Sequence, residues 1–298
     1  MNMLSVPEYH APSDVTDRHW RALFRGEFYA REQGHDLHTC MGQTMHYGPL
    51  RVQRPFYPEG SDLLHMYLLH PPGGLVGGDQ LSIQVRALTK AKVLVTTPSA
   101  GKLYRNESDM LQGQEVDIQV ADGAVVEYLP QENIIFNGAK GTLNTRVNIE
   151  GSGLFIGWEI TCLGRPEGNQ FFEEGQLKQS LMLYQDGRPL FLDRLHLDAQ
   201  DGIMQSKVGL QNKLAFATCV VNRELSPDAF NALIELQQVL NQAHKEEYLA
   251  VTQKPGVLII RVLGNRAEPI RNLLEAVWRI IRPALHNREV CIPRIWNT

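Results

Sequence analysis

Alternation of apolar and polar residues with a period of two dominates the chain from about residue 20 to residue 221. In residues 81–87, Leu, Ile, Val and Ala alternate with Ser, Gln and Arg, and residues 116–120 and 147–150 repeat the pattern. This pattern is typical of half-buried β-strands, whose successive side chains point to opposite faces of a sheet. The clearest hairpin joins residues 177–184 to residues 189–197. Turn sequences separate the segments, at Asp122-Gly123, Asn137-Gly138, Asp186-Gly187 and Asp201-Gly202.

Many short strands at this spacing predict a mainly β body, either a sandwich-like body or strands wound in a helical manner. The sequence contains no repeat of fixed period, which does not support a regular solenoid. Residues 1–18 hold two prolines and few apolar residues, so we expect a flexible N-terminal tail.

The pattern changes after residue 221. Ser226-Pro227-Asp228 is a helix start, and apolar residues on one face extend this helix to about His244. A second amphipathic helix begins near Pro269, and Pro283 ends it or lies in its last turn. With the predicted strands at residues 214–221, 248–252 and 257–263, residues 214–285 read as β-α-β-β-α. This portion is either a small subdomain or two helices laid on the β body.

Charge and composition exclude several classes of protein. The net charge is −4, from 29 Lys and Arg against 33 Asp and Glu, which favours neither nucleic acid nor anionic lipid as a partner. No apolar run approaches the ~20 residues of a membrane-spanning helix, and the polar, acidic start is unlike a signal peptide. The four cysteines are far apart and suit a reducing cytoplasm better than a disulfide framework: Cys40, Cys162, Cys219 and Cys291.

The loop His70–Asp79 carries two prolines and four glycines between two predicted strands. A plain hairpin needs only two such residues, so the shape of this loop is strongly specified. A strand follows the glycines, which excludes a dinucleotide fingerprint, and Asp79-Gln80 stands where a phosphate loop has Lys followed by Ser or Thr. The loop is either a rigid connection or a device that places Asp79 at its exit.

Two acidic residues lie inside or beside apolar strands. Glu132 and Glu159 point away from their apolar neighbours, so each either faces water or lines an internal polar space. A buried carboxylate needs an arginine, a water molecule or a metal ion as its partner. Lys102, Tyr104 and Arg105, which follow a predicted strand, could supply such partners or could belong to a solvated turn.

Other combinations of residues suggest metal binding or catalysis. Cys162 with His70 or Asp79 could bind a borderline metal, because thiolate and imidazole suit nickel and zinc. Residues 99–102 match S-x-x-K, but the companion K-T-G and S-D-N motifs are missing. A hydrolase or transferase could use His70, Asp79 and Arg105 in a cleft, although no nucleophile–base pair can be assembled from the sequence.

A series of motifs runs in order along the chain, at residues 48–60, 69–79, 96–98, 104–105, 129–132, 157–160, 162–166, 282–285 and 293–296. From about residue 20 to the C-terminus, this series resembles the UreD (UreH) family of urease accessory proteins. The family usually has Thr-Lys-Phe-Tyr-Arg at residues 101–105, where this chain has Gly101 and Leu103 in place of Thr and Phe. It usually has Glu-Thr-Ile-(Val/Ile)-Phe-Asp-Gly at residues 132–138, where this chain has Asn133 and Asn137 in place of Thr and Asp.

The resemblance implies a single domain over residues 19–298, with strands wound in a helical manner and two helices in the C-terminal half. It implies a non-enzymatic, cytoplasmic metallochaperone that binds apo-urease and UreF, and through UreF the GTPase UreG. Nickel would be cargo in transit, with no tightly bound cofactor. A purely structural clamp without metal passage is the alternative within the same family.

The resemblance also suggests roles for particular residues. Family members are thought to carry an internal, water-filled passage, and carboxylates with retained waters would pass nickel without trapping it. The candidate path residues are Asp79, Glu132, Glu159, His70 and Cys162. The candidate residues for contact with UreF lie near the C-terminus, where apolar anchors are present: Trp278, Arg294, Ile295 and Trp296.

Overall fold

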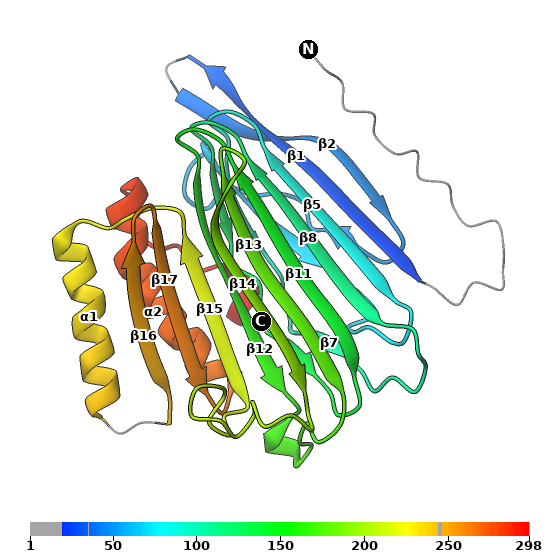
Figure 1. Ribbon diagram of the computed structural model, residues 1–298. Coiled ribbons are helices and arrows are strands. Elements are labelled where there is room, and N and C mark those ends of the chain that lie inside the picture. The colour runs from blue at the N-terminus through cyan, green and yellow to red at the C-terminus, as the bar shows by residue number, and fades with distance from the viewer. Residues whose placement is uncertain (1–19, 35, 244–245, 298) are drawn as a thin grey trace.

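The computed structural model describes residues 20–34, 36–243 and 246–297, and it consists of two β-sheets and two α-helices (Figure 1). The predicted tail over residues 1–18 lies outside the described residues. The seven-stranded sheet has the order β14 (Arg188–Asp198), β13 (Gln176–Gln185), β11 (Lys140–Ile149), β8 (Gln112–Val120), β5 (Gln80–Ala87), β1 (Arg21–Gln33) and β2 (Asp36–Tyr47).

The ten-stranded sheet faces it. Its main path is β16 (Tyr248–Lys254), β17 (Val257–Gly264), β15 (Ala215–Val221), β12 (Leu154–Leu163), β9 (Val125–Tyr128), β6 (Lys92–Thr96), β4 (Leu63–Leu69) and β3 (Arg51–Val52). Two short strands complete it: β10 (Asn133–Ile135) pairs with β12 and with β7 (Gly101–Leu103).

Successive strands of the chain alternate between the two sheets, which gives a solenoid-like winding. The chain passes from β4 to β5, β6, β8, β9, β11, β12 and β13, changing sheet at each of these steps, and the neighbouring strands so formed are parallel. The predicted mainly β fold with helically wound strands is therefore confirmed. Strands β4, β6, β9 and β12 begin at residues 63, 92, 125 and 154, so successive turns take 29, 33 and 29 residues. Unequal turns leave no repeat of fixed period in the sequence.

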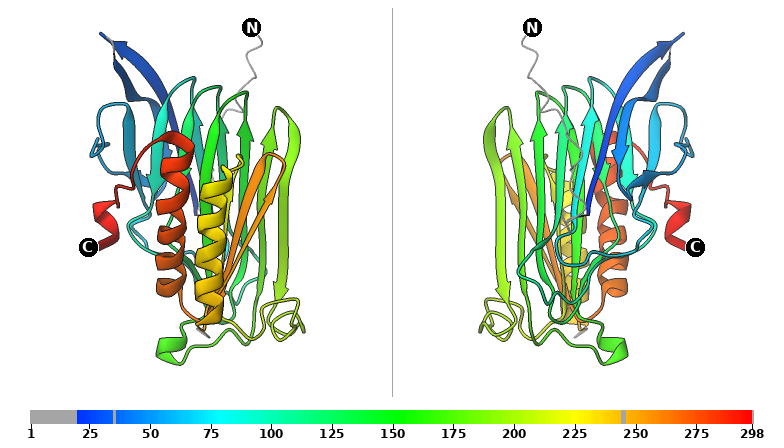
Figure 2. Two further views of the ribbon diagram at one scale, coloured as in Figure 1. Left: turned by 90° about the vertical axis from the view of Figure 1, so that its left-hand side faces the viewer. Right: turned by 90° about the vertical axis from the view of Figure 1, so that its right-hand side faces the viewer.

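The two sheets differ in how their faces are covered. One apolar cluster fills the space between the sheets, and a second lies between the ten-stranded sheet and helices α1 (Pro227–Gln242) and α2 (Ala267–His286). Figure 2 shows both helices on the same side of the molecule. Strand β12 is buried along its whole length because both of its faces are covered, whereas β5 alternates buried and partly exposed residues.

The predicted C-terminal elements are present with small shifts at their ends. The Ser226 hydroxyl accepts a hydrogen bond from the Ala229 amide and starts α1, which ends at Gln242, two residues before the predicted end. Helix α2 starts two residues before Pro269 and includes Pro283 near its end. Because β15 and β17 continue the ten-stranded sheet from β12, the helices are laid on the β body. Within the described residues, no helix has the length and apolar character needed to cross a membrane.

Candidate functional site

The loop that follows β4 is shaped by its own hydrogen bonds, and Asp79 closes it. The Asp79 carboxylate accepts a hydrogen bond from the Val76 amide at 2.9 Å, and the His70 carbonyl accepts one from Gly73 at 2.9 Å. Burial raises the pKa of Asp79, and burial lowers the pKa of His70, although the two side chains attract one another. Of the two interpretations, a rigid connection accounts for the contacts of Asp79, because its carboxylate holds the loop together.

Glu159 projects from the middle of β12 into the space between the sheets. Its carboxyl group accepts hydrogen bonds from the Thr145 hydroxyl on β11 and from the Gln179 amide on β13, the latter at 2.9 Å. Both partners are neutral, so burial dominates and raises the pKa of Glu159. Of the two possibilities for this residue, the internal polar position is therefore the observed one.

Glu159 lines a cavity of about 620 Å³ between the β13–β14 hairpin and strands β15–β17. Asp193 on β14 and Arg261 on β17 also line it and form an ion pair at 2.9 Å. Thr218 on β15 accepts a hydrogen bond from Arg261 at 3.4 Å. The lining thus includes two carboxyl groups and two arginines, Arg194 and Arg261, among mostly apolar side chains. The carboxyl and neutral side-chain oxygen atoms are hard ligands for a hydrated divalent cation.

Glu132 and Cys162 lie together at a second place, beside the start of α2. They line a cavity of about 180 Å³, and Glu132 forms an ion pair with Arg271 at 3.4 Å. Burial, with a smaller effect from the charge of Glu132, raises the pKa of the Cys162 thiol to about 12. The thiol is therefore protonated at neutral pH and must lose its proton before it can bind a metal.

The five candidate path residues occupy three separate places. His70 lines a small cavity of about 60 Å³ with Lys102, near the loop that Asp79 closes, while Glu159 lies in the large cavity and Glu132 and Cys162 lie beside α2. Within residues 20–34, 36–243 and 246–297, no three His, Cys, Asp or Glu side chains are grouped closely enough to hold a metal ion. A cation that passes the described residues would therefore meet at most two such side chains at a time.

The arrangement that a hydrolase would need is not formed. Arg105 forms ion pairs with Glu174 at 3.2 Å and with Glu107 at 3.6 Å, so its charge is paired with these two acids and not with Asp79. The predicted pairing of Arg105 or Lys102 with Glu132 and Glu159 is also wrong. Arg271 forms the ion pair with Glu132, and Glu159 accepts hydrogen bonds from neutral side chains.

Sequence reasoning missed Asp193 and Arg261. The alternation of β14 contained the signal for Asp193, because Leu195 and Leu197 point toward the core and Asp193 lies in phase with them. Arg261 carried no such signal, because it lies at an exposed position of β17 and only the three-dimensional fold brings it to Asp193.

The C-terminal candidates divide between core and surface. Trp278 is fully buried against Trp158, with ring centroids 6.1 Å apart, so core packing accounts for it and its predicted contact with a partner does not fit. Trp296 is half-buried and donates a hydrogen bond to the Thr96 hydroxyl at 2.8 Å. Arg294 is exposed and Ile295 is half-buried, so both are within reach of a partner.

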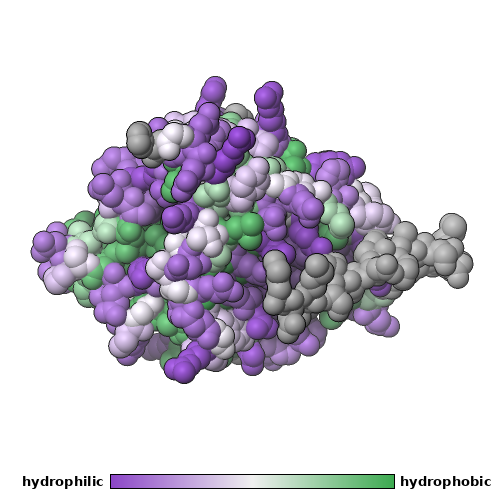
Figure 3. All heavy atoms as spheres, turned by 90° about the horizontal axis from the view of Figure 1, so that it is seen from above, coloured by the Kyte–Doolittle hydropathy of each residue, from purple (hydrophilic) through white to green (hydrophobic). Residues whose placement is uncertain are grey.

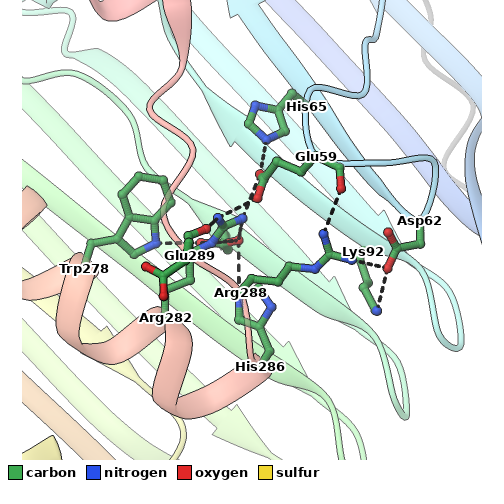
Figure 4. A network of polar contacts seen from close by, with 10 residues as sticks. Glu59, Asp62, His65, Lys92, Trp278, Arg282, His286, Arg288 and Glu289 are labelled. Atoms are coloured by element: carbon green, nitrogen blue, oxygen red, sulfur yellow. Dashed lines mark hydrogen bonds and ion pairs between the residues drawn. The ribbon is translucent and has the colours of Figure 1, made fainter.

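A buried ionic network, also missed from the sequence, holds the end of α2 to the ten-stranded sheet (Figure 4). Arg282 bonds to Glu59 at 2.7 Å and to Glu127 at 3.0 Å, and Trp278 donates to Glu127 at 2.7 Å. Burial opposes ionisation of Glu59, but hydrogen bonds from His65 and Arg282 lower its pKa to about 2. The same kinds of contact lower the pKa of Glu127.

Comparison with known proteins identifies the family. A model of the UreD urease accessory protein family matches residues 25–297. A urease accessory protein UreD of Saccharophagus degradans is 41% identical over 87% of this chain and 88% of its own length. The UreD protein of Alcanivorax borkumensis is 39% identical over 96% of both chains, and that of Pseudoalteromonas translucida is 39% identical over the full length of both. This chain, with its solenoid of strands and its buried carboxyl group at Glu159, belongs to the UreD family of urease accessory proteins.

Proposed function

We propose that this protein is a non-enzymatic scaffold of urease maturation that passes nickel through its interior to apo-urease. Membership of the urease accessory family supports a role in maturation. The observation that carries the finer proposal is the cavity of about 620 Å³ that contains Glu159, Asp193 and Arg261. A β body that only clamps its partners has no need of two carboxyl groups beside a cavity between its sheets.

The protonation of Glu159 supports a passage that can take up and release a cation. Burial raises the pKa of Glu159, which favours the neutral acid while no cation is present. An arriving divalent cation stabilises the carboxylate and displaces the proton, and the reverse exchange releases the cation. Oxygen ligands bind nickel less tightly than a cluster of His and Cys, so the cation could leave again.

The partners we propose are UreF, UreG through UreF, and the urease structural subunits, in the cytoplasm. The exposed Arg294 and the half-buried Ile295 are the proposed contacts with UreF, and Trp296 anchors that segment to β6 through Thr96. Nickel is the cargo, and no tightly bound cofactor enters the proposal.

Co-expression with urease and the other accessory proteins tests the passage. Glu159→Gln removes the carboxyl group that would exchange its proton for a cation, and Asp193→Asn removes a negative charge, both with little change in volume. Glu235→Gln on the exposed side of α1 is the matched control. We expect both cavity variants to assemble with urease and to leave it poor in nickel and inactive, and the control to behave as wild type. Full nickel content in both cavity variants would remove the cavity from the path. Loss of activity only in step with loss of assembly would favour the structural clamp.

A further inference from the structure

Among the residues that the structure describes, no helix covers the outer face of the seven-stranded sheet. Helices α1 and α2 cover the outer face of the ten-stranded sheet, and the opposite view in Figure 2 has both helices behind the sheets. Strands β1, β5, β8, β11, β13 and β14 carry their outward side chains in cross-strand rows, because their registers align. One such row runs through Arg25, Gln84, Asp117, Arg146, Met182 and Leu192.

This face is more basic than the rest of the protein. Its four central rows carry six basic and three acidic side chains, an excess of three positive charges on a chain whose net charge is −4. None of the six basic side chains forms an ion pair with an acid among the described residues. The basic residues are Arg21, Arg25, Arg86, Arg146, Lys178 and Arg194, and the acidic residues are Glu27, Glu115 and Asp117.

The size and rigidity of the face suit a protein interface. Six strands about 4.8 Å apart, each with about nine residues rising ~3.3 Å, give roughly 800 Å², close to the area each partner buries in a standard complex. The paired backbones fix the positions of the side chains before binding. The Arg146 guanidinium group lies 4.4 Å from the centroid of the Tyr184 ring, which holds it in place.

The composition of the face also distinguishes protein from polyanion as the partner. Tyr29 is 38% exposed, Met45 is 51% exposed and Leu192 is 50% exposed, and Tyr, Met and Arg are enriched at protein interfaces. Glu115 and Asp117, in the middle of the sheet, would repel a nucleic acid or a lipid phosphate. The interspersed acids and apolar groups fit a folded partner with a mainly acidic surface.

We propose that the outer face of the seven-stranded sheet is a docking surface for an acidic surface of the urease apoprotein. This inference rests on the proposed function for the identity of the partner. Complementary charge would guide the encounter and fix the orientation, and the apolar and aromatic side chains would supply contact area.

Charge reversal on matched faces tests the surface. The triple variant Arg25→Glu, Arg146→Glu, Arg194→Glu changes the docking face, and Lys207→Glu, Lys254→Glu, Arg279→Glu makes the same change of charge at exposed sites elsewhere. Binding of each purified, folded protein to purified apo-urease is measured at low and high salt. We expect the first triple to weaken binding about 30-fold or more, as for hot-spot residues, and the second to weaken it less than threefold.

A second triple variant, with neutral instead of acidic replacements, keeps the test valid if the Arg25→Glu, Arg146→Glu, Arg194→Glu variant misfolds. Changing the same three arginines to Gln removes attraction without adding repulsion, so we expect a smaller loss of affinity and a weaker dependence on salt. Binding of wild type and of all variants with equal affinity would overturn the docking surface and leave the proposed function standing. Failure of wild type to bind apo-urease would overturn both. Binding of duplex DNA as tightly as apo-urease at physiological salt would reassign the face to nucleic acid.

Discussion

Replacement of Arg282 by methionine is the sharpest test of the network that holds α2 (Figure 4). The guanidinium group is fully buried and bonds to Glu59 and Glu127 at 2.7 to 3.1 Å. Methionine is apolar, so the Arg282→Met variant leaves two carboxylates in the interior without their shared cation. Breaking a buried pair in this way costs about 3–5 kcal/mol. We therefore expect the free energy of unfolding at pH 7 to fall by about 4 kcal/mol, a large part of the 5–15 kcal/mol of a typical domain.

Equilibrium unfolding in guanidinium chloride, followed by tryptophan fluorescence, measures this change. The probe is local, because Trp278 donates to Glu127 at 2.7 Å and its ring lies 6.1 Å from those of Trp158 and Trp296. Arg279→Met is the matched control, since Arg279 lies on the same helix and is exposed. An exposed substitution of this kind changes the free energy of unfolding by about 0.5 kcal/mol or less.

A double variant separates charge from packing. Adding Glu127→Gln to Arg282→Met removes one of the two stranded carboxylates, so we expect the double variant to be more stable than the sum of the single changes by at least about 1 kcal/mol. Strict additivity, or a loss below about 1 kcal/mol for Arg282→Met, would refute the view that electrostatic pairing holds the end of α2.

Three further predictions follow from single contacts. The pKa of Glu59 falls from 4.5 to about 2 on folding, so its contribution to stability is complete above pH 4.5 and is lost as the pH falls toward 2. The melting temperature of the wild type should therefore fall between pH 5 and pH 2, and Glu59→Gln should reduce the slope of melting temperature against pH. A Cβ at Gly74 would lie 2.4 Å from the Tyr104 ring, so Gly74→Ala should lower the free energy of unfolding in guanidinium chloride by about 1–3 kcal/mol. Gly168→Ala is the control, because no atom lies within 4 Å of its added carbon. The Cys162 thiol has a pKa of about 12, so a maleimide at pH 7.5 should label it far more slowly in the native protein than in guanidinium chloride, and equal rates by mass spectrometry would contradict its burial.

The strands were predictable because burial imposes a period on the sequence. Where one face meets water, as in β5, the alternation marks the strand, and where both faces are covered, as in β4, an apolar run marks it. The β13–β14 hairpin was found within a residue or two because its turn and both of its strands are local. The order of the strands depends on contacts between residues about 30 positions apart, and nothing in the alternation of one strand specifies its neighbour.

The candidate site was only partly predictable, for a related reason. Glu159 stood out as an acid in an apolar strand. Its position between the sheets is clear only from the fold, in which Phe155 and Leu163, on the same side of β12, pack between the sheets. Its cavity depends on β13, β14, β15 and β17, which meet through the winding of the chain and the later hairpins. Trp278 was assigned to a partner contact because it is an aromatic residue near the C-terminus. The apolar stripe of α2 already indicated that it lies in the core, as it does.

Two buried glutamates in this fold differ in their partners, and the difference bears on the proposed nickel passage. Glu127 faces the helices and meets Arg282, so its charge is permanent and its pKa is lowered. Glu159 faces the space between the sheets and meets only neutral donors, so burial raises its pKa. A carboxylate already paired with a buried arginine has no charge to offer a cation without losing several kcal/mol of stability. A neutral acid beside a cavity can exchange its proton for a cation at a smaller cost, and this difference is why the proposed nickel passage runs by Glu159.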